Sequence, residues 1–269
     1  MAKLWVFGDS FSDGITKTIK RYNSYSEEEW ETYKPGPQHS YFIWKQKQKG
    51  EIPTHFEDIV AEHFGIEEIR NEAVGGYCNE DIIESIGNYI DEIEEDDVVI
   101  IGWTDPARTR FIDTNKRWTI MHPATIDNPK DWLRGKGLSQ KGKQGIIEML
   151  VLRMEASVYY RDTNIARYWK MEGHIDPLEK QLLSYAKILN KNLPKNTLHW
   201  TWCGDENHNL FYHPTYVENQ KLPTISKETD ERFSDGHYSE TALIELGKMM
   251  INWFKEPKRL YPNLYNKPI

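Results

Sequence analysis

The chain has 269 residues, of which 38% are hydrophobic and 28% charged, and its net charge is −8. This length suits one large domain or a domain that carries an insertion. The acidic balance argues against a nucleic-acid partner, which normally faces a basic surface, and no apolar run approaches the ~18 residues of a membrane span. Because the first strand is expected close to the N-terminus, we expect no cleavable leader and a cytoplasmic protein, or one in a particle assembled there, such as a virion.

The first hundred residues alternate between short apolar runs and segments with helical spacing. The helix predicted at 54–64 starts at Thr54, a suitable N-cap, and stops at Gly65. The predicted order is a strand at 4–7, mostly loop at 16–53, the helix at 54–64, a short strand before 71, a helix at 81–93 and a strand at 98–102. Strands that alternate with helices in this way predict a parallel sheet with crossover helices.

The alternation is interrupted after residue 105. We expect a largely helical insertion at about 106–196 within a single domain that spans 1–269, and the insertion begins with a candidate hairpin, ARTRFIDTNKRWTIMH. A strand at 197–203 and a final helix at 239–254, capped by Ser239, complete the predicted α/β fold. Several aromatic residues of the insertion either pack it or stack on sugar rings: Trp118, Trp132, Tyr159, Tyr160 and Trp169.

Residues able to carry out chemistry occur just after the first strand and just before the last helix. Ser10 follows the strand at 4–7, and ligands of open parallel sheets bind beyond the carboxyl ends of the strands. A serine hydroxyl becomes a useful nucleophile when a neighbouring base takes its proton, and FSDGHYSE supplies His237 with Asp235 beside it. The alternative is structural, with Ser10 as a turn residue and His237 as a polar residue flanking a helix.

Four short blocks occur in an order that resembles the SGNH or GDSL hydrolase family of serine esterases. They are GDSFSDG at 8–14, NEAVGG at 71–76, IIGWTD at 100–105 and DGHYS at 235–239. The resemblance implies a three-layer α/β/α sandwich of flavodoxin-like build, with Ser10 as nucleophile, His237 as base and Asp235 as the acid. It also implies an oxyanion hole made of the Ser10 and Gly76 N–H groups and an Asn side chain of the third block. The Gly-Trp-Thr of that block resembles phage-encoded members.

Two positions depart from the family pattern. Thr104 stands where the family has Asn, and loss of one oxyanion donor costs about 10²–10³ in rate elsewhere. Asp105, Arg108 or a residue of the insertion are alternative donors. The acid lies two residues before His237, whereas the family usually has it three residues before, so a backbone carbonyl is the alternative partner of the imidazole.

These blocks lead us to expect a serine esterase that acts on small acyl esters, most simply O-acetyl groups on a carbohydrate, with no metal or cofactor. The expected partner is therefore a small-molecule or glycan ester. An O-acyltransferase would use the same site with a sugar hydroxyl in place of water. A binding or virion-associated protein that kept the fold but turns over weakly is the alternative from another class.

Overall fold

The computed structural model describes residues 1–15, 24, 26, 37–104, 109–112, 118–121, 175–202, 211–214, 222 and 236–255. The chain divides into two compact units, each considered by itself. The first consists of Met1–Tyr77, Asp81–Thr104 and Ala186–Ile269, and the second of Cys78–Glu80 and Asp105–Tyr185. Among the described residues, no helix has the length and apolar character needed to cross a membrane.

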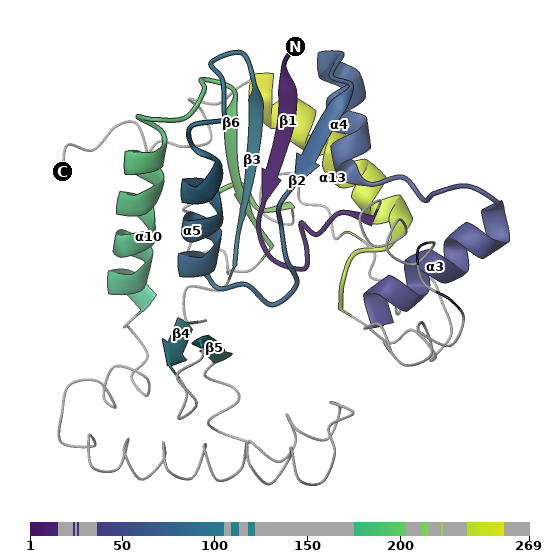
Figure 1. Cartoon of the computed structure of the whole chain (residues 1–269), viewed down its shortest axis with the longest axis horizontal. Helices are drawn as coiled ribbons and strands as arrows, with labels where there is room; N and C mark the ends of the chain where they lie inside the picture. The colour runs from purple at the N-terminus through teal and green to yellow at the C-terminus, as the bar shows by residue number, and fades with distance from the viewer. Residues whose placement is uncertain are drawn as a thin grey trace, which may run out of the picture. The chain divides into compact units, whose positions relative to one another are not determined.

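The first unit is built on a four-stranded sheet in which all neighbouring strands run parallel, in the order β2-β1-β3-β6 (Figure 1). The register pairs Val6 of β1 with Asn71 of β2 and with Ile100 of β3. The strands are β1 (Lys3–Phe7), β2 (Glu68–Asn71), β3 (Val98–Trp103) and β6 (Thr197–Thr201). The predicted α/β class with a parallel sheet is thus confirmed at this level.

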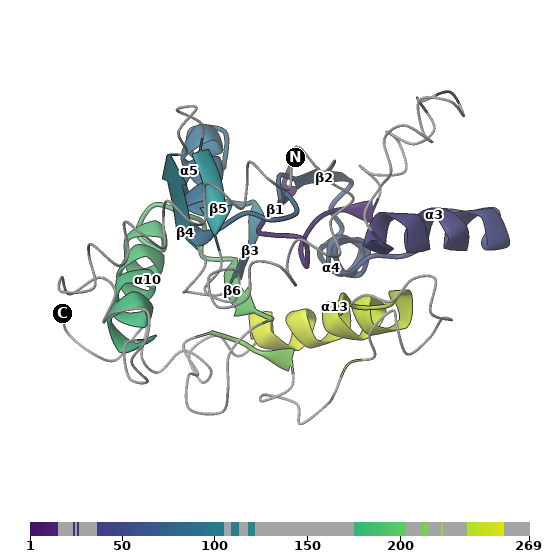
Figure 2. The same ribbon diagram turned by 90° about the horizontal axis from the view of Figure 1, so that it is seen from below.

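Helices lie on both faces of this sheet, as Figures 1 and 2 show together. On one face, α4 (Phe56–Phe64) packs closely with α13 (Glu240–Lys255), and a Cβ added to Gly247 would lie 2.8 Å from the Ile59 Cβ. On the other face lies α5 (Asn79–Tyr89), whose Tyr89 ring contacts Trp5 and Phe7 of β1. The central strands are therefore covered on both sides, which explains why VVIIGW is buried throughout.

The order of the strands places a reversal of the winding direction at one end of the sheet. The chain passes from β1 to β2 on one side, then crosses over to β3 on the other side of β1. In sheets of this kind, ligands bind where the direction of winding reverses, beyond the carboxyl ends of the strands. Here that position lies between the ends of β1 and β3, directly before Ser10 and Thr104.

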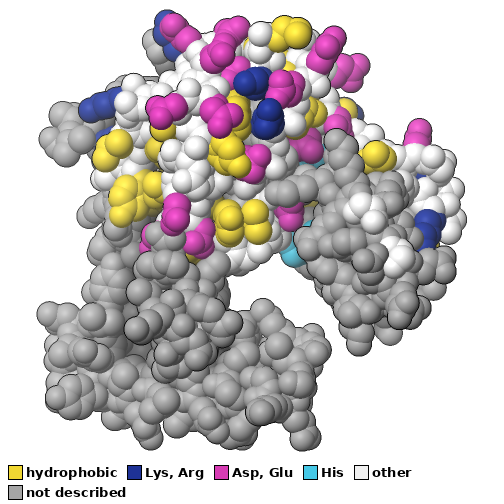
Figure 3. Space-filling view, viewed as in Figure 1, with side chains coloured by type: hydrophobic (Ala, Val, Ile, Leu, Met, Phe, Trp, Pro, Cys, Tyr) yellow, Lys and Arg dark blue, Asp and Glu magenta, His cyan; other side chains and the backbone are white. Residues whose placement is uncertain are grey.

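The opposite end of the sheet, where the strands begin, carries a cluster of acidic residues. The turn between α5 and β3 carries exposed carboxylates, and Figure 3 shows acidic side chains gathered on this side of the unit. They include Asp91, Glu92, Glu94, Glu95 and Asp96. The negative charge of this turn therefore lies at the amino end of β3, at the opposite end of the sheet from Ser10.

A buried polar network lies within the core between β3 and β6. Trp103 Nε1 donates a hydrogen bond of 3.0 Å to Nδ1 of His199, and Nε2 of the same ring lies 2.8 Å from the Asn190 Oδ1. Since Nδ1 accepts, Nε2 carries the proton and donates to Asn190. Burial lowers the pKa of His199 to about 3, so the ring is neutral in the folded protein.

Several predicted boundaries differ from the structure. The segment 16–53 was predicted as mostly loop, which is wrong for Pro37–Lys49, the helix α3. Its apolar residues are consecutive, so they show no helical spacing, and proline is tolerated at the first helical position. The N-cap of α4 is His55, whose N–H donates to Asp58 Oδ2 at 2.7 Å, one residue later than predicted. Gly65 ends this helix with φ +66, as predicted.

The predictions for α5, for the hairpin and for the insertion agree with the structure to different extents. The helix α5 begins and ends earlier than the predicted 81–93. In the second unit, β4 (Thr109–Ile112) pairs antiparallel with β5 (Trp118–Met121), which confirms the hairpin. The helix α10 (Ile175–Leu189) agrees with the start near residue 176 that the sequence Asp176-Pro177-Leu178-Glu179 predicts, with a cap and a proline at the first helical position. The basic segment RGKGLSQKGKQG at 134–145, expected as a solvated loop, and the long helical stretch expected at about 146–171 lie outside the described residues.

Candidate active site

Ser10 lies at the tip of a tight turn that follows β1. The Ser12 N–H donates 2.9 Å to the Asp9 carbonyl, and the Phe11 N–H donates 3.0 Å to the Asp9 Oδ1. Asp9 is fully buried, whereas Ser10 is partly exposed. A turn stabilised by its own Asp side chain in this way holds the intervening residue outward. The Ser10 side chain is therefore presented at the carboxyl edge of the sheet.

Two glycines let this turn lie tightly against the sheet. A Cβ on Gly8 would lie 2.4 Å from the Ser12 Oγ, and a Cβ on Gly102 of β3 would lie 2.1 Å from the same oxygen. The Ser12 hydroxyl therefore occupies the space that side chains at both positions would need. It is buried and makes no hydrogen bond among the described residues. Glycine at both positions is a packing requirement of the turn that carries Ser10.

His237 comes to this turn from the far end of the chain. Its Nε2 lies 2.7 Å from the Ser10 Oγ, although 227 positions separate the two residues. His237 precedes α13, whose first turn is capped by Ser239 through a 3.3 Å bond from the Ala242 N–H, as predicted. An imidazole nitrogen at this distance can take the proton of the hydroxyl, which is the geometry of an activated serine.

Aromatic rings surround the pair. The Phe11 ring stacks on the Trp202 indole with centroids 4.1 Å apart and on the His237 imidazole at 4.5 Å. Tyr238 meets Phe11 edge-on at 5.3 Å. The Trp202 Nε1 donates 2.8 Å to the second carboxylate oxygen of Asp9. Neither Phe11 nor Trp202 was predicted as a site residue; the available signal was an aromatic residue shortly after each of two parallel strands, four residues beyond β1 and one residue beyond β6.

A second turn with two glycines lies beside Ser10. The Val74 N–H donates 3.1 Å to the Gly8 carbonyl, and the Tyr77 N–H closes a turn on the Val74 carbonyl at 3.2 Å. Gly76, the third residue of this turn, has φ +91, which is typical of a type II turn and favours glycine. A Cβ on Gly75 would lie 3.6 Å from the Ser10 Cβ. The turn thus brings backbone that carries no side chains next to the hydroxyl.

Asn71, the first residue of the second block, joins the two turns. Its Nδ2 donates 2.8 Å to the Ser12 carbonyl, and its Oδ1 accepts 3.0 Å from the Ala73 N–H. The same Nδ2 donates to the carboxylate of Glu57, a buried residue of α4. One amide therefore fixes the Ser10 turn and the glycine turn relative to each other.

The N-terminal end of α3 also contacts the Ser10 turn. Gln38 Nε2 donates 3.0 Å to the Ser10 carbonyl, and the His39 Nε2 lies 3.6 Å from the Asp13 Oδ2. The helix α3, which was not predicted from the sequence, therefore places polar side chains next to the candidate nucleophile.

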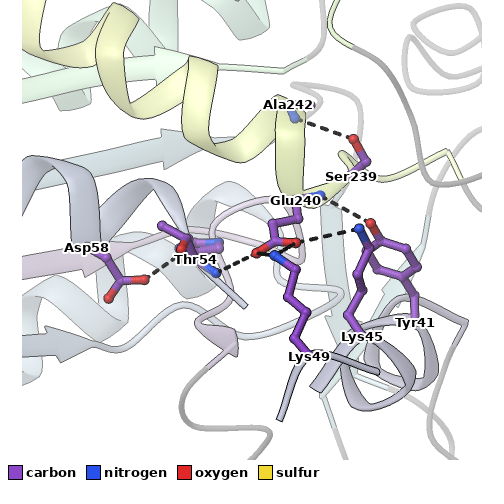
Figure 4. Close-up of polar contacts among 9 residues, drawn as sticks. Tyr41, Lys45, Lys49, Thr54, Asp58, Ser239, Glu240 and Ala242 are labelled. Atoms are coloured by element: carbon purple, nitrogen blue, oxygen red, sulfur yellow. Dashed lines mark hydrogen bonds and ion pairs between the residues drawn. The ribbon is translucent and has the colours of Figure 1, made fainter. Parts of the chain in front are cut away.

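The other end of α3 is tied to the start of α13 through Glu240 (Figure 4). The Lys49 Nζ lies 2.7 Å from both oxygens of the Glu240 carboxylate, and the Thr54 N–H donates to it at 3.0 Å. The Lys45 Nζ lies 3.5 Å away, and the Glu240 N–H donates to the Tyr41 hydroxyl at 3.4 Å. Burial alone would raise the pKa of Glu240, but the hydrogen bonds and the two lysines outweigh it and hold the pKa below its ordinary value.

The other predicted site residues are placed less completely. Thr104 directly follows β3 at the same edge and is buried, with 1% of its surface exposed. Asp235, Asp105 and Arg108 lie outside the described residues, so their roles stay predictions. Among the residues that the structure does describe, no group of three or more His, Cys, Asp or Glu side chains is arranged to hold a metal ion.

Comparison with known proteins adds no assignment to this geometry. No family model, curated protein or solved structure matches the chain.

Proposed function

We propose that the chain is a serine esterase of the SGNH type that acts on small acyl esters. The observation that carries the proposal is the 2.7 Å contact between the Ser10 Oγ and the His237 Nε2 at the carboxyl edge of a parallel sheet. An alcohol hydrogen-bonded to an imidazole is the arrangement that acyl transfer through a serine nucleophile uses.

The proposed reaction has two steps. The Ser10 Oγ attacks the ester carbonyl carbon while the His237 Nε2 takes its proton, and the resulting tetrahedral intermediate carries negative charge on the former carbonyl oxygen. The intermediate collapses as the bond to the leaving alcohol breaks, and that alcohol receives the proton from His237. Water then attacks the acyl-serine, with His237 again as base, and the carboxylic acid leaves with Ser10 restored.

The backbone around Ser10 supports this assignment. The glycine turn at Val74–Tyr77 lies against Ser10, so the Gly76 N–H and the Ser10 N–H are the proposed donors to the oxyanion. Preorganised donors of this kind are usually the largest single term in such catalysis. Thr104 is the proposed third contributor, although its burial favours a smaller part than an Asn would play. Asp235 is the proposed partner of the other ring nitrogen.

We also propose a more specific fold, which the same family resemblance implies. The strand order β2-β1-β3-β6 and the helices on both faces support a three-layer α/β/α sandwich of flavodoxin-like build. The proposed substrate is an O-acetyl group on a carbohydrate. Half-exposed rings near Ser10 favour this choice, because aromatic faces stack well on sugar rings.

The experiment compares the wild-type chain with Ser10→Ala, using turnover of p-nitrophenyl acetate and covalent labelling by a fluorophosphonate. We expect label and turnover in the wild type and neither in the variant, whose fold is checked by thermal melting. Release of free acetate from an acetylated sugar would support a hydrolase, and transfer of acetate to a second sugar would support an acyltransferase. If the folded wild type is not labelled by the fluorophosphonate and does not turn over p-nitrophenyl acetate, both the hydrolase and the acyltransferase proposals are refuted and a binding protein is favoured.

A further inference from the structure

The imidazole of His237 lies against an aromatic ring as well as against a hydroxyl. The planes of Phe11 and His237 are inclined by 29° with centroids 4.5 Å apart, and Phe11 lies at 15° to Trp202 with centroids 4.1 Å apart. The Phe11 ring therefore couples the position of the indole to that of the imidazole. Trp202 directly follows β6, and no residue of β6 takes part in the proposed chemistry.

Trp202 is held from two directions. Its Nε1–H donates 2.8 Å to the Asp9 Oδ2, and its carbonyl accepts 3.0 Å from the Nε2 of the buried His213. Asp9 is itself fixed, because its other oxygen accepts the Phe11 N–H. The indole, the phenyl ring and the turn of Ser10 thus form one connected unit anchored on a buried carboxylate.

We propose that Trp202 is a positioning residue for His237 and acts through the Phe11 ring; this inference rests on the proposed esterase function. The angle about the Cβ–Cγ bond of histidine is broad, so an imidazole needs contacts that fix its plane. A hydrogen bond to the edge of the ring leaves the plane free to tilt about that bond, whereas a ring stacked on its face opposes the tilt. The stack thereby keeps Nε2 directed at Ser10.

Exposure separates this role from ordinary core packing. Trp5, Trp103, Trp200 and Trp253 are fully buried in the unit, whereas Phe11, Trp202 and His237 are all partly exposed. Rings at a partly open edge contribute less to stability through burial than rings in the core. Trp202 is therefore better placed to orient the imidazole than to stabilise the fold.

The test compares Trp202→Ala and Trp202→Phe with a matched control, Trp253→Phe. Trp253 stacks on Tyr212 in the core, and its indole nitrogen makes no hydrogen bond among the described residues. We expect Trp202→Ala to lower kcat for p-nitrophenyl acetate at least about 10-fold while KM changes less than about twofold, since general bases contribute about 10²–10⁴. Trp202→Phe, which keeps a ring, should recover part of the loss. The control should melt at a lower temperature with kcat within about twofold.

A second readout does not depend on turnover. The imidazole C–H resonances of His237, assigned with His237→Gln, should be shifted upfield by the ring current of Phe11. They should move downfield in Trp202→Ala but not in Trp253→Phe. Unmoved resonances, or a kcat for Trp202→Ala within twofold of an active wild type, would overturn the proposal. If the wild type has no esterase activity, the proposed function fails and the resonances alone decide whether Trp202 positions the ring.

Discussion

Replacing Glu240 by glutamine tests whether the contact between α3 and α13 depends on charge. The amide keeps the shape of the carboxylate and can still accept the Thr54 N–H, which lies 3.0 Å from the present oxygen. It removes the negative charge that faces Lys49 at 2.7 Å and Lys45 at 3.5 Å. It also removes a negative charge from the first turn of α13, where the helix dipole favours an anion.

The expected loss of stability lies between the values for surface and buried ion pairs. Breaking a fully buried pair costs about 3–5 kcal/mol, and a hydrogen bond to a charged group contributes about 1.5–3 kcal/mol. The side chains of Lys45 and Lys49 are 23% and 39% exposed, so both ammonium groups regain contact with water. We therefore expect Glu240→Gln to lower the free energy of unfolding by about 1–2 kcal/mol at pH 7. The melting temperature should fall by about 2–8 °C.

The pH dependence of this loss has a definite sign. The folded-state pKa of Glu240 lies below its ordinary value of 4.5, so the carboxylate contributes its full stability above that value. The contribution is lost as the pH falls through the lower folded-state pKa. The difference between wild type and Glu240→Gln should therefore be full at pH 7 and shrink below about pH 4.

Urea denaturation at pH 7 and at pH 3.5 measures both quantities. Glu245→Gln on the same helix is the matched control, because Glu245 and Lys248 form an exposed pair that should contribute no more than about 1 kcal/mol. The reasoning fails if the two variants are equally stable at pH 7, or if the loss in Glu240→Gln is the same at both pH values.

Two further predictions concern the core. Because the pKa of His199 is about 3 when folded and 6.5 in its ordinary state, wild-type stability falls as the pH drops through that window. His199→Gln should reduce the slope of unfolding free energy against pH by about 1.4 kcal/mol per unit there, measured by urea unfolding, and an unchanged slope would contradict burial of a neutral ring. Gly102→Ala should cost about 1–3 kcal/mol, since its Cβ would meet the Ser12 Oγ at 2.1 Å. Gly87→Ala on the exposed side of α5, with nothing within 4 Å, should instead gain about 0.5–1 kcal/mol, and a reversed order would refute the packing argument.

The central part of the fold could be predicted because its signals are local. The runs that form β1 and β3 are continuously apolar, and Gly65 marks the end of α4 through its left-handed conformation. The helix α3 could not be predicted in this way. Its buried apolar residues Tyr41, Phe42 and Ile43 are consecutive, so the face it buries is set by its tertiary contacts and not by apolar spacing.

In the candidate site too, some residues could be predicted from local sequence signals and others could not. The pairing of Ser10 with His237 was predicted from the order of short blocks, and the structure brings the two side chains together. The contribution of Phe11 and Trp202 could not be read from the sequence, because each looks like an ordinary apolar residue after a strand. Only the adjacency of the ends of β1, β3 and β6 places their rings in contact.

The distance along the chain between Ser10 and His237 has a consequence for synthesis. A nascent chain that has emerged from the ribosome as far as β6 already exposes the hydroxyl of Ser10, which follows β1, whereas the imidazole of His237 has not yet emerged. At about 5–20 residues per second, the 227 positions between the two residues take roughly 11–45 s to synthesise, so the contact can form only after that interval. Until then the Ser10 hydroxyl lacks the His237 base, and any product that ends before His237 keeps the candidate nucleophile without that base.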